Sequence, residues 1–265
     1  MAEIKIQYVS DIHLEHRSKF SKIVVPQPRV KFLALCGNIG NFQNTSLLRS
    51  FLSYVSSNWE HTWYVPGNHE LYSFKTPAST IIAQLRQLCT EWPNVHFLHR
   101  DFVDVPDTSL RVVGTTWWSH VPYENSFVQN LIGDYQSIKL NDKSTLTTTV
   151  SNEWHRLDHA WFQKTIEDSV NTQKTVLVLT HHLPSFRMIA DKYSGLVVNC
   201  CFASHDDEFI TKSKNIAAWI CGHSYVAKVE EFKTEDGKIV TCALNACGYP
   251  HEHVYGFSTG AVITV

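Results

Sequence analysis

Residues 62–70, Thr62-Trp63-Tyr64-Val65-Pro66-Gly67-Asn68-His69-Glu70, join a short run of aromatic and β-branched residues to a polar group. The run at 62–65 predicts a buried β-strand, because it is composed of residue types enriched in strands. In open α/β sheets, ligands bind in the crevice beyond the carboxyl ends of the strands. The stretch therefore predicts a strand that delivers Asn68, His69 and Glu70 to a site.

The same arrangement recurs at four other places along the chain. Each is a β-like run followed by histidine, aspartate or carboxamide residues: 4–9 before Asp11-Ile12-His13, 32–36 before Gly37-Asn38-Ile39-Gly40, 175–179 before Thr180-His181-His182, and 216–221 before Gly222-His223-Ser224-Tyr225. One such motif is weak evidence, since an isolated histidine is most often a structural or surface residue. Five in succession, each offering oxygen or nitrogen ligands, predict one shared site.

The remaining elements indicate a mixed α/β fold. Further strands are expected at 95–98, 110–114, 229–232 and 239–244, the last two joined by a turn at Glu235-Asp236-Gly237. Apolar residues at helical spacing predict helices around 47–55 and 81–88, and a third at about 152–170 with Ser151 as its N-cap. The polar segment 122–149 is expected to be a long surface excursion that could border the site.

Composition narrows the classes of function. The 265 residues, 43% of them hydrophobic, are expected to form a single domain over 1–265. A net charge of -2 gives no basic field, so neither general nucleic-acid binding nor binding to an anionic membrane is expected. The seven cysteines form no Cys-x-x-Cys pair, the N-terminus has no signal-peptide pattern, and no apolar run has membrane-spanning length. A cytoplasmic location with reduced thiols is therefore expected.

The order of the five motifs resembles the calcineurin-like metallophosphoesterase family. That family's motifs run Asp-x-His, Gly-Asp, Gly-Asn-His-Asp/Glu, His and Gly-His-x-His, and the similarity extends from Ile4 to about Gly248. The resemblance implies an α/β fold of a particular kind: a four-layer αββα sandwich with two mixed β-sheets. It also implies two divalent transition metal ions above the strand ends, and mixed histidine, carboxylate and amide ligands suit manganese, iron, cobalt or zinc.

The resemblance assigns a role to each matching residue. It implies that Asp11 and His13 bind the first metal, while Asn68, His181 and His223 bind the second. His69 would lie beside the scissile phosphate and assist the leaving oxygen, and Glu70 would orient the His69 ring. His182 would lie behind the metal ligands, and His120, His155, His159 and His205 are interpreted as structural or surface residues.

Two positions depart from the family pattern, and both affect the first metal. Asn38 replaces the aspartate that bridges the two metals, and Tyr225 replaces the last histidine. A neutral amide leaves more of the repulsion between two cations uncompensated, and Tyr225 could ligate only as a phenolate. The resemblance implies two ions, and the alternative is a single ion, bound in the second site. The sequence fits two origins of Asn38: a natural residue, or a deliberate exchange of the aspartate that inactivates the protein.

The expected activity is hydrolysis of a phosphomonoester or phosphodiester by metal-bound hydroxide. The alternative is a catalytically degenerate relative that binds a phosphorylated ligand or a protein partner without turnover. The partner would be a small phosphorylated substrate such as a nucleotide, with which aromatic residues near the mouth could stack: Tyr72, Phe74, Trp117, Trp118 and Tyr123. His251 or His253 could supply the missing ligand, although both also fit a surface loop.

Overall fold

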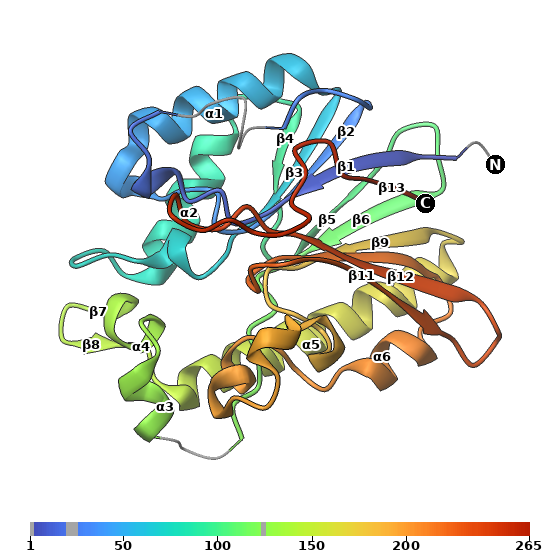
Figure 1. Cartoon of the computed structure of the whole chain (residues 1–265). Helices are drawn as coiled ribbons and strands as arrows, with labels where there is room; N and C mark the ends of the chain where they lie inside the picture. The colour runs from blue at the N-terminus through green and yellow to red at the C-terminus, as the bar shows by residue number, and fades with distance from the viewer. Residues whose placement is uncertain (1–2, 20–25, 123–125) are drawn as a thin grey trace.

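The computed structural model describes residues 3–19, 26–122 and 126–265, and its strands form two large mixed sheets that lie face to face (Figure 1). The first sheet has the strand order β13-β1-β2-β3-β4, and the second has the order β11-β12-β10-β9-β6-β5. All neighbouring strands of the first sheet are parallel except β13, which runs antiparallel to β1. In the second sheet only the edge strands β5 and β11 are antiparallel to their neighbours.

The strands are short. Those of the first sheet are β1 (Lys5–Val9), β2 (Phe32–Cys36), β3 (His61–Val65), β4 (Val95–Phe97) and β13 (Val262–Thr264). Those of the second are β5 (Asp101–Asp104), β6 (Leu110–Gly114), β9 (Thr175–Leu179), β10 (Ile216–Cys221), β11 (Ala227–Lys233) and β12 (Ile239–Asn245). A separate pair consists of β7 (Lys139–Asn141) and β8 (Ser144–Thr145).

Helices cover the outer face of each sheet (Figure 1). The α-helices are α1 (Thr45–Asn58), α2 (Ala78–Cys89), α3 (Ser126–Leu131), α4 (Asp134–Ser137), α5 (Thr148–Asn171) and α6 (Asp207–Lys212). The 3-10 helices are η1 (Leu14–His16), η2 (Phe42–Asn44), η3 (His69–Leu71), η4 (Phe186–Met188), η5 (Asp191–Tyr193) and η6 (Val197–Cys201). Helices α1 and α2 pack on the first sheet, whereas α5 and α6 pack on the second.

The layers pack against one another through three apolar cores. The central core joins the inner faces of the two sheets, with Trp63 and Cys36 from the first sheet against Leu177 and Ile220 from the second. A second core joins α1 and α2 to the first sheet, and a third joins α5 and α6 to the other. Three cores between four layers make an αββα sandwich, as expected from the resemblance.

The predicted strands are confirmed with small shifts at their ends, and the hairpin of β11 and β12 turns at Gly237, whose φ is +87°. The predicted cap of the long helix was wrong. Helix α5 begins at Thr148, one turn earlier, because the Thr147 side chain accepts a hydrogen bond from the Val150 amide. Ser151 lies inside the helix and is buried.

The segment 122–149 is more structured than expected for a surface excursion. It holds α3, α4, β7 and β8, and it buries Val128, Tyr135, Ile138 and Leu146. It also borders the pocket described below, through Leu131 and Asp134 among others. Its polar sequence hid these elements because each is six residues or shorter.

All seven cysteines are free thiols, and six of them are buried. Among the described residues, no helix combines the length and the apolar character that crossing a membrane requires.

Candidate metal centre

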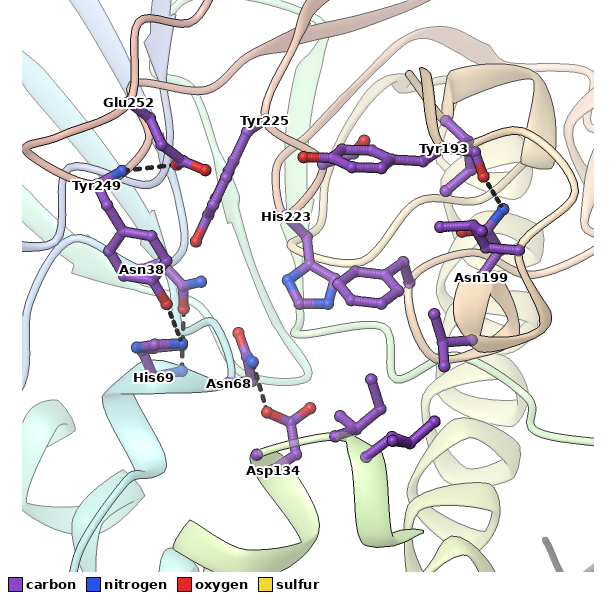
Figure 2. Close-up of a pocket in the computed structure, with 18 of the residues that line it drawn as sticks. Asn38, Asn68, His69, Asp134, Tyr193, Asn199, His223, Tyr225, Tyr249 and Glu252 are labelled. Carbon is purple, nitrogen blue, oxygen red and sulfur yellow. Dashed lines mark hydrogen bonds between the residues drawn. The ribbon is translucent and has the colours of Figure 1, made fainter. Parts of the chain in front are cut away.

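The residues expected at the site come together where the two sheets meet, at the carboxyl ends of their strands. The first sheet supplies Asp11 and His13 after β1, Asn38 after β2, and Asn68, His69 and Glu70 after β3; the second supplies His181 after β9, and His223 and Tyr225 after β10. The sheets are joined here, because the His223 amide donates to Asp11 Oδ2 at 2.9 Å. Figure 2 shows five of these residues, Asn38, Asn68, His69, His223 and Tyr225, where they line a pocket.

Four of these residues adopt a left-handed backbone. The φ angles are 56° at Asp11, 52° at His13, 53° at Asn38 and 71° at His223. This conformation is costly for residues with a Cβ atom and persists where the surrounding structure enforces it, which is common at functional sites. The strand ends are thus shaped to aim these side chains at a common point.

Two of the second-metal residues, Asn68 and His181, present lone pairs to each other without a proton between them. His181 Nδ1 donates to the Cys36 carbonyl at 2.8 Å, so Nε2 carries the lone pair. Asn68 Nδ2 donates to Asp134 at 2.6 Å, so its Oδ1 is the atom that lies 3.0 Å from His181 Nε2. His223 Nδ1 approaches the same nitrogen at 3.1 Å. Convergent acceptors of this kind fit a cation.

Burial also favours a metal ion at these residues, because it keeps the histidines neutral. Desolvation and the neighbouring His182 ring lower the pKa of His181 well below its usual value, and burial likewise lowers that of His223. Neutral imidazoles are the form that binds metal. Ligand atoms of Asp11, His181 and His223 also lie within 4.8 Å of one another, so the Asp11 carboxylate is within reach of the same cation. These residues therefore fit one divalent metal.

The first-metal residues are instead paired with one another. Asn38 Oδ1 accepts from the His69 amide at 2.9 Å, which turns Nδ2 toward Asp11, where it donates to Oδ1 at 3.1 Å. The amide thus presents a donor where the family has a bridging carboxylate. Tyr225 closes the other side, with its hydroxyl 3.0 Å from His13 Nε2. Burial raises the pKa of Tyr225 above its usual value, which disfavours the phenolate that ligation requires.

His69 lies beside this cluster, but the prediction that Glu70 orients its ring was wrong. The Glu70 carboxylate accepts from the Gly67, Asn38 and Ile39 amides and from the Tyr64 hydroxyl, at 2.7 to 2.9 Å. Those bonds hold the loop after β2 against the loop after β3 and turn Glu70 away from the His69 ring. The ring is held by Glu15, whose Oε1 is 3.3 Å from His69 Nδ1 and 2.9 Å from His13 Nδ1.

Glu15, Asp134 and Tyr249 are three site residues that sequence reasoning missed. Glu15 stands two residues after His13, and that spacing was the one available signal. Asp134 comes from the segment without periodicity. The Tyr249 hydroxyl lies 3.1 Å from His69 Nε2. Tyr249 belongs to the loop that also holds His251 and His253, the two candidates for the missing metal ligand. Both of those histidines are exposed.

A cavity of about 380 Å³ opens from the cluster. The metal residues Asn68 and His223 line it together with a largely apolar set of residues, of which Figure 2 labels Tyr193. That set is Leu131, Ile132, Ile189, Tyr193, Leu196, Val198 and Phe202. The carboxylic acid side chains in the lining are Asp134 and Glu252, and no lysine or arginine of the described chain lines it.

Of the aromatic residues expected at the mouth, only Tyr72 lies there among those that the structure describes. Tyr72 lines the cavity and stacks on His69 with ring centroids 4.1 Å apart. Trp117 and Trp118 are buried in the interior, and Phe74 is 89% exposed outside this cavity. Tyr123 lies outside the described residues.

Comparisons with known proteins agree with this architecture. A family described as calcineurin-like phosphoesterase matches residues 4–227. An uncharacterized protein, L509, of Acanthamoeba polyphaga mimivirus is 29% identical over 268 residues, covering 93% of this chain and 92% of the viral protein. Phosphopantetheinyl hydrolase (PptH) from Mycobacterium tuberculosis has a similar fold, with a TM-score of 0.70 and 16% identity over 100% of this chain and 96% of its own. A dimetal phosphatase from Danio rerio gives a TM-score of 0.54 and 14% identity over 98% of each chain.

Proposed function

The chain belongs to the calcineurin-like phosphoesterase family, and from this premise we propose that it hydrolyses a phosphate ester at the centre formed by Asn68, His181 and His223. The observation that carries the proposal is the contact between two acceptors, Asn68 Oδ1 and His181 Nε2, at 3.0 Å. Two buried lone pairs at that distance repel each other unless a cation lies between them.

Asn68, His181 and His223 would hold one divalent ion, with manganese, iron, cobalt and zinc all compatible with the ligand types. When bound, such an ion polarises a phosphoryl oxygen and offsets the charge that develops on it. The chain's own residues supply the rest. His69 Nε2, now in contact with the Tyr249 hydroxyl, is placed to hold or pass a proton at the leaving oxygen, while Glu15 fixes the opposite side of its ring.

The cavity supports a substrate with little charge and an apolar part. A lining without lysine or arginine, and with Asp134 and Glu252, disfavours groups that carry several phosphates. We infer a small phosphodiester, with one negative charge, whose organic group lies against Tyr193, Leu196 and Phe202. A nucleotide or the phosphopantetheinyl group in the name of the mycobacterial neighbour would be concrete test compounds. The buried free cysteines support action in a reducing compartment such as the cytoplasm.

The test is metal content by elemental analysis, together with hydrolysis of a chromogenic phosphomonoester and phosphodiester under added manganese. We expect about one manganese at this centre in the protein as it stands and about two in Asn38→Asp, with higher turnover, because the exchange replaces an N–H donor by a carboxylate. Asn58→Asp, an exposed asparagine on α1, is the matched control and should behave as the parent.

The outcome that would contradict the proposal is an absence of bound metal and of hydrolysis in both the parent and Asn38→Asp. His181→Ala adds a second check, since it removes a proposed ligand of the retained ion. It should lose both the manganese bound at this centre and the activity.

A second candidate function is binding of a phosphorylated ligand without turnover. It is favoured by the pairing of Asn38 with Asp11 and of Tyr225 with His13, which closes the first half of the centre. The double variant Asn38→Asp with Tyr225→His distinguishes the two. A large gain in hydrolysis identifies a catalytic scaffold, whereas ligand binding with no gain in hydrolysis identifies a binding protein.

A further inference from the structure

A second group of potential metal ligands lies on the outer side of the second sheet. His155 and His159 stand four residues apart on α5, so both project from one face of the helix. Their ring centroids are 4.8 Å apart, and His159 Nε2 lies 2.7 Å from Asp206 Oδ1. The three ligand atoms all lie within 4.8 Å of one another.

Two of these side chains are oriented by partners behind them. His155 Nδ1 is 2.6 Å from the Trp118 carbonyl, to which it must donate, so Nε2 carries the lone pair. The Trp117 indole donates to Asp206 Oδ2 at 3.0 Å, which leaves Oδ1 for the cluster. A backbone carbonyl behind a histidine and a donor behind a carboxylate are the outer contacts that metal ligands characteristically have.

The cluster is partly open to solvent and separate from the proposed active site. The His159 side chain is 29% exposed, whereas that of Asp206 is 9% exposed. His159 and Asp206 line two surface cavities, and neither they nor His155 line the cavity at the metal centre. An ion could therefore reach this cluster without passing through the active site.

We propose that His155, His159 and Asp206 bind a zinc ion that ties α5 to the loop before α6. Two imidazoles and one carboxylate suit zinc, with water completing a tetrahedral site. Through the contacts of Trp117 and Trp118, the ion would also fix the segment after β6. The Trp118 ring lies 5.0 Å from that of His182, which in turn stacks on His223 at 4.3 Å. The zinc would thus support the wall behind a ligand of the proposed active-site metal.

The test uses the full chain, loaded with zinc alone and freed of loose metal on a desalting column. Elemental analysis should find about one zinc fewer per chain in His159→Gln and in Asp206→Asn than in the parent. His205→Gln is the matched control: this nearby histidine stacks on Phe186, and its exchange should leave the zinc content unchanged. Parent-level zinc in both His159→Gln and Asp206→Asn would overturn the proposal.

A second measurement separates this zinc from the active-site metal and does not depend on the stoichiometry. In a His181→Ala background, zinc should still raise the unfolding temperature, and adding Asp206→Asn should abolish that rise. A rise that is absent in His181→Ala, or that survives Asp206→Asn, would contradict a second zinc site.

Discussion

At the scale of single residues, Glu15 links two histidines of the site through one carboxylate oxygen. Its buried Oε1 contacts His13 Nδ1 and His69 Nδ1 together, at 2.9 and 3.3 Å. Burial alone would raise its pKa, but the hydrogen bonds from both rings outweigh burial and lower the pKa to about 2. The ionised carboxylate thus fixes the His13 ring, which belongs to the first-metal residues, and the His69 ring, which is proposed to assist the leaving oxygen.

Glu15→Gln should slow phosphoester hydrolysis by about 10–100-fold, the usual range for losing a group that orients a metal ligand or catalytic histidine. The amide can no longer accept from both rings as an anion, whereas Asn68, His181 and His223 are untouched. Steady-state kinetics with metal content measured in parallel should show a lower kcat and retained metal. Glu167→Gln, an exposed glutamate on α5, is the control, and an unchanged kcat in Glu15→Gln would refute the assigned role.

The sequence predicted which residues gather at the centre better than it predicted their partners. The Asp-x-His and Gly-Asn-His-Glu motifs identify strand ends, and strand ends of one sheet necessarily meet at one edge. Hydrogen-bond partners depend on shifts of about an ångström that no spacing rule encodes. Glu70, adjacent to His69 in sequence, therefore binds the loop that contains Asn38. Glu15 makes the contact with the His69 ring that was expected of Glu70.

At the scale of elements, α5 shows how local chemistry sets a boundary. Thr147 has an extended backbone, with φ -128° and ψ 161°, and its side chain accepts from the Val150 amide at 3.3 Å. The helix therefore starts early enough to bury Thr148, which contacts Gln129, and Ser151, which contacts Tyr135. The same helix carries His155 and His159, so its register determines where the second ligand group lies.

Thr147→Ala should lower the free energy of unfolding by about 1 kcal/mol, the typical cost of losing a side-chain N-cap. The loss arises because the Val150 amide has no other acceptor within the first turn. Urea denaturation followed by circular dichroism measures it. Lys164→Ala, an exposed position in the middle of α5, should change stability far less; equal effects of the two exchanges would argue against capping by Thr147.

Strand prediction succeeded for the inner strands and for the edge strands β4 and β11, but it missed the edge strands β5 and β13. The inner strands β2, β6, β9 and β10 are almost wholly buried and apolar, which is the signal that marks them in sequence. The edge strands β5 and β13 alternate between exposed and covered residues over four and three positions, respectively. Such short alternations also occur in loops, so only pairing with a neighbouring strand defines them.

At the scale of the whole molecule, the proposed metal lies on the boundary between the two sheets. Asn68 follows β3 of the first sheet, while His181 and His223 follow β9 and β10 of the second. Other contacts at this boundary are Asn245 Nδ2 with the Tyr8 carbonyl at 2.9 Å and the bridge between Ser10 and Ala246. A metal held by residues of both sheets should therefore stabilise their packing as well as provide catalysis.

Manganese at about 100 times its dissociation constant would stabilise the folded state by about 2.7 kcal/mol, which corresponds to a rise of roughly 5–10 °C in unfolding temperature for a chain of this size. Removing it with a chelator should reverse the rise, because the unfolded chain cannot bring both sheets' ligands together. Calorimetry of the parent with manganese and with chelator measures the difference. His181→Ala should show none, whereas His159→Gln, which disrupts only the outer ligand group, should keep it. An equal rise in His181→Ala would mean that manganese stabilises the chain from somewhere other than the boundary between its sheets.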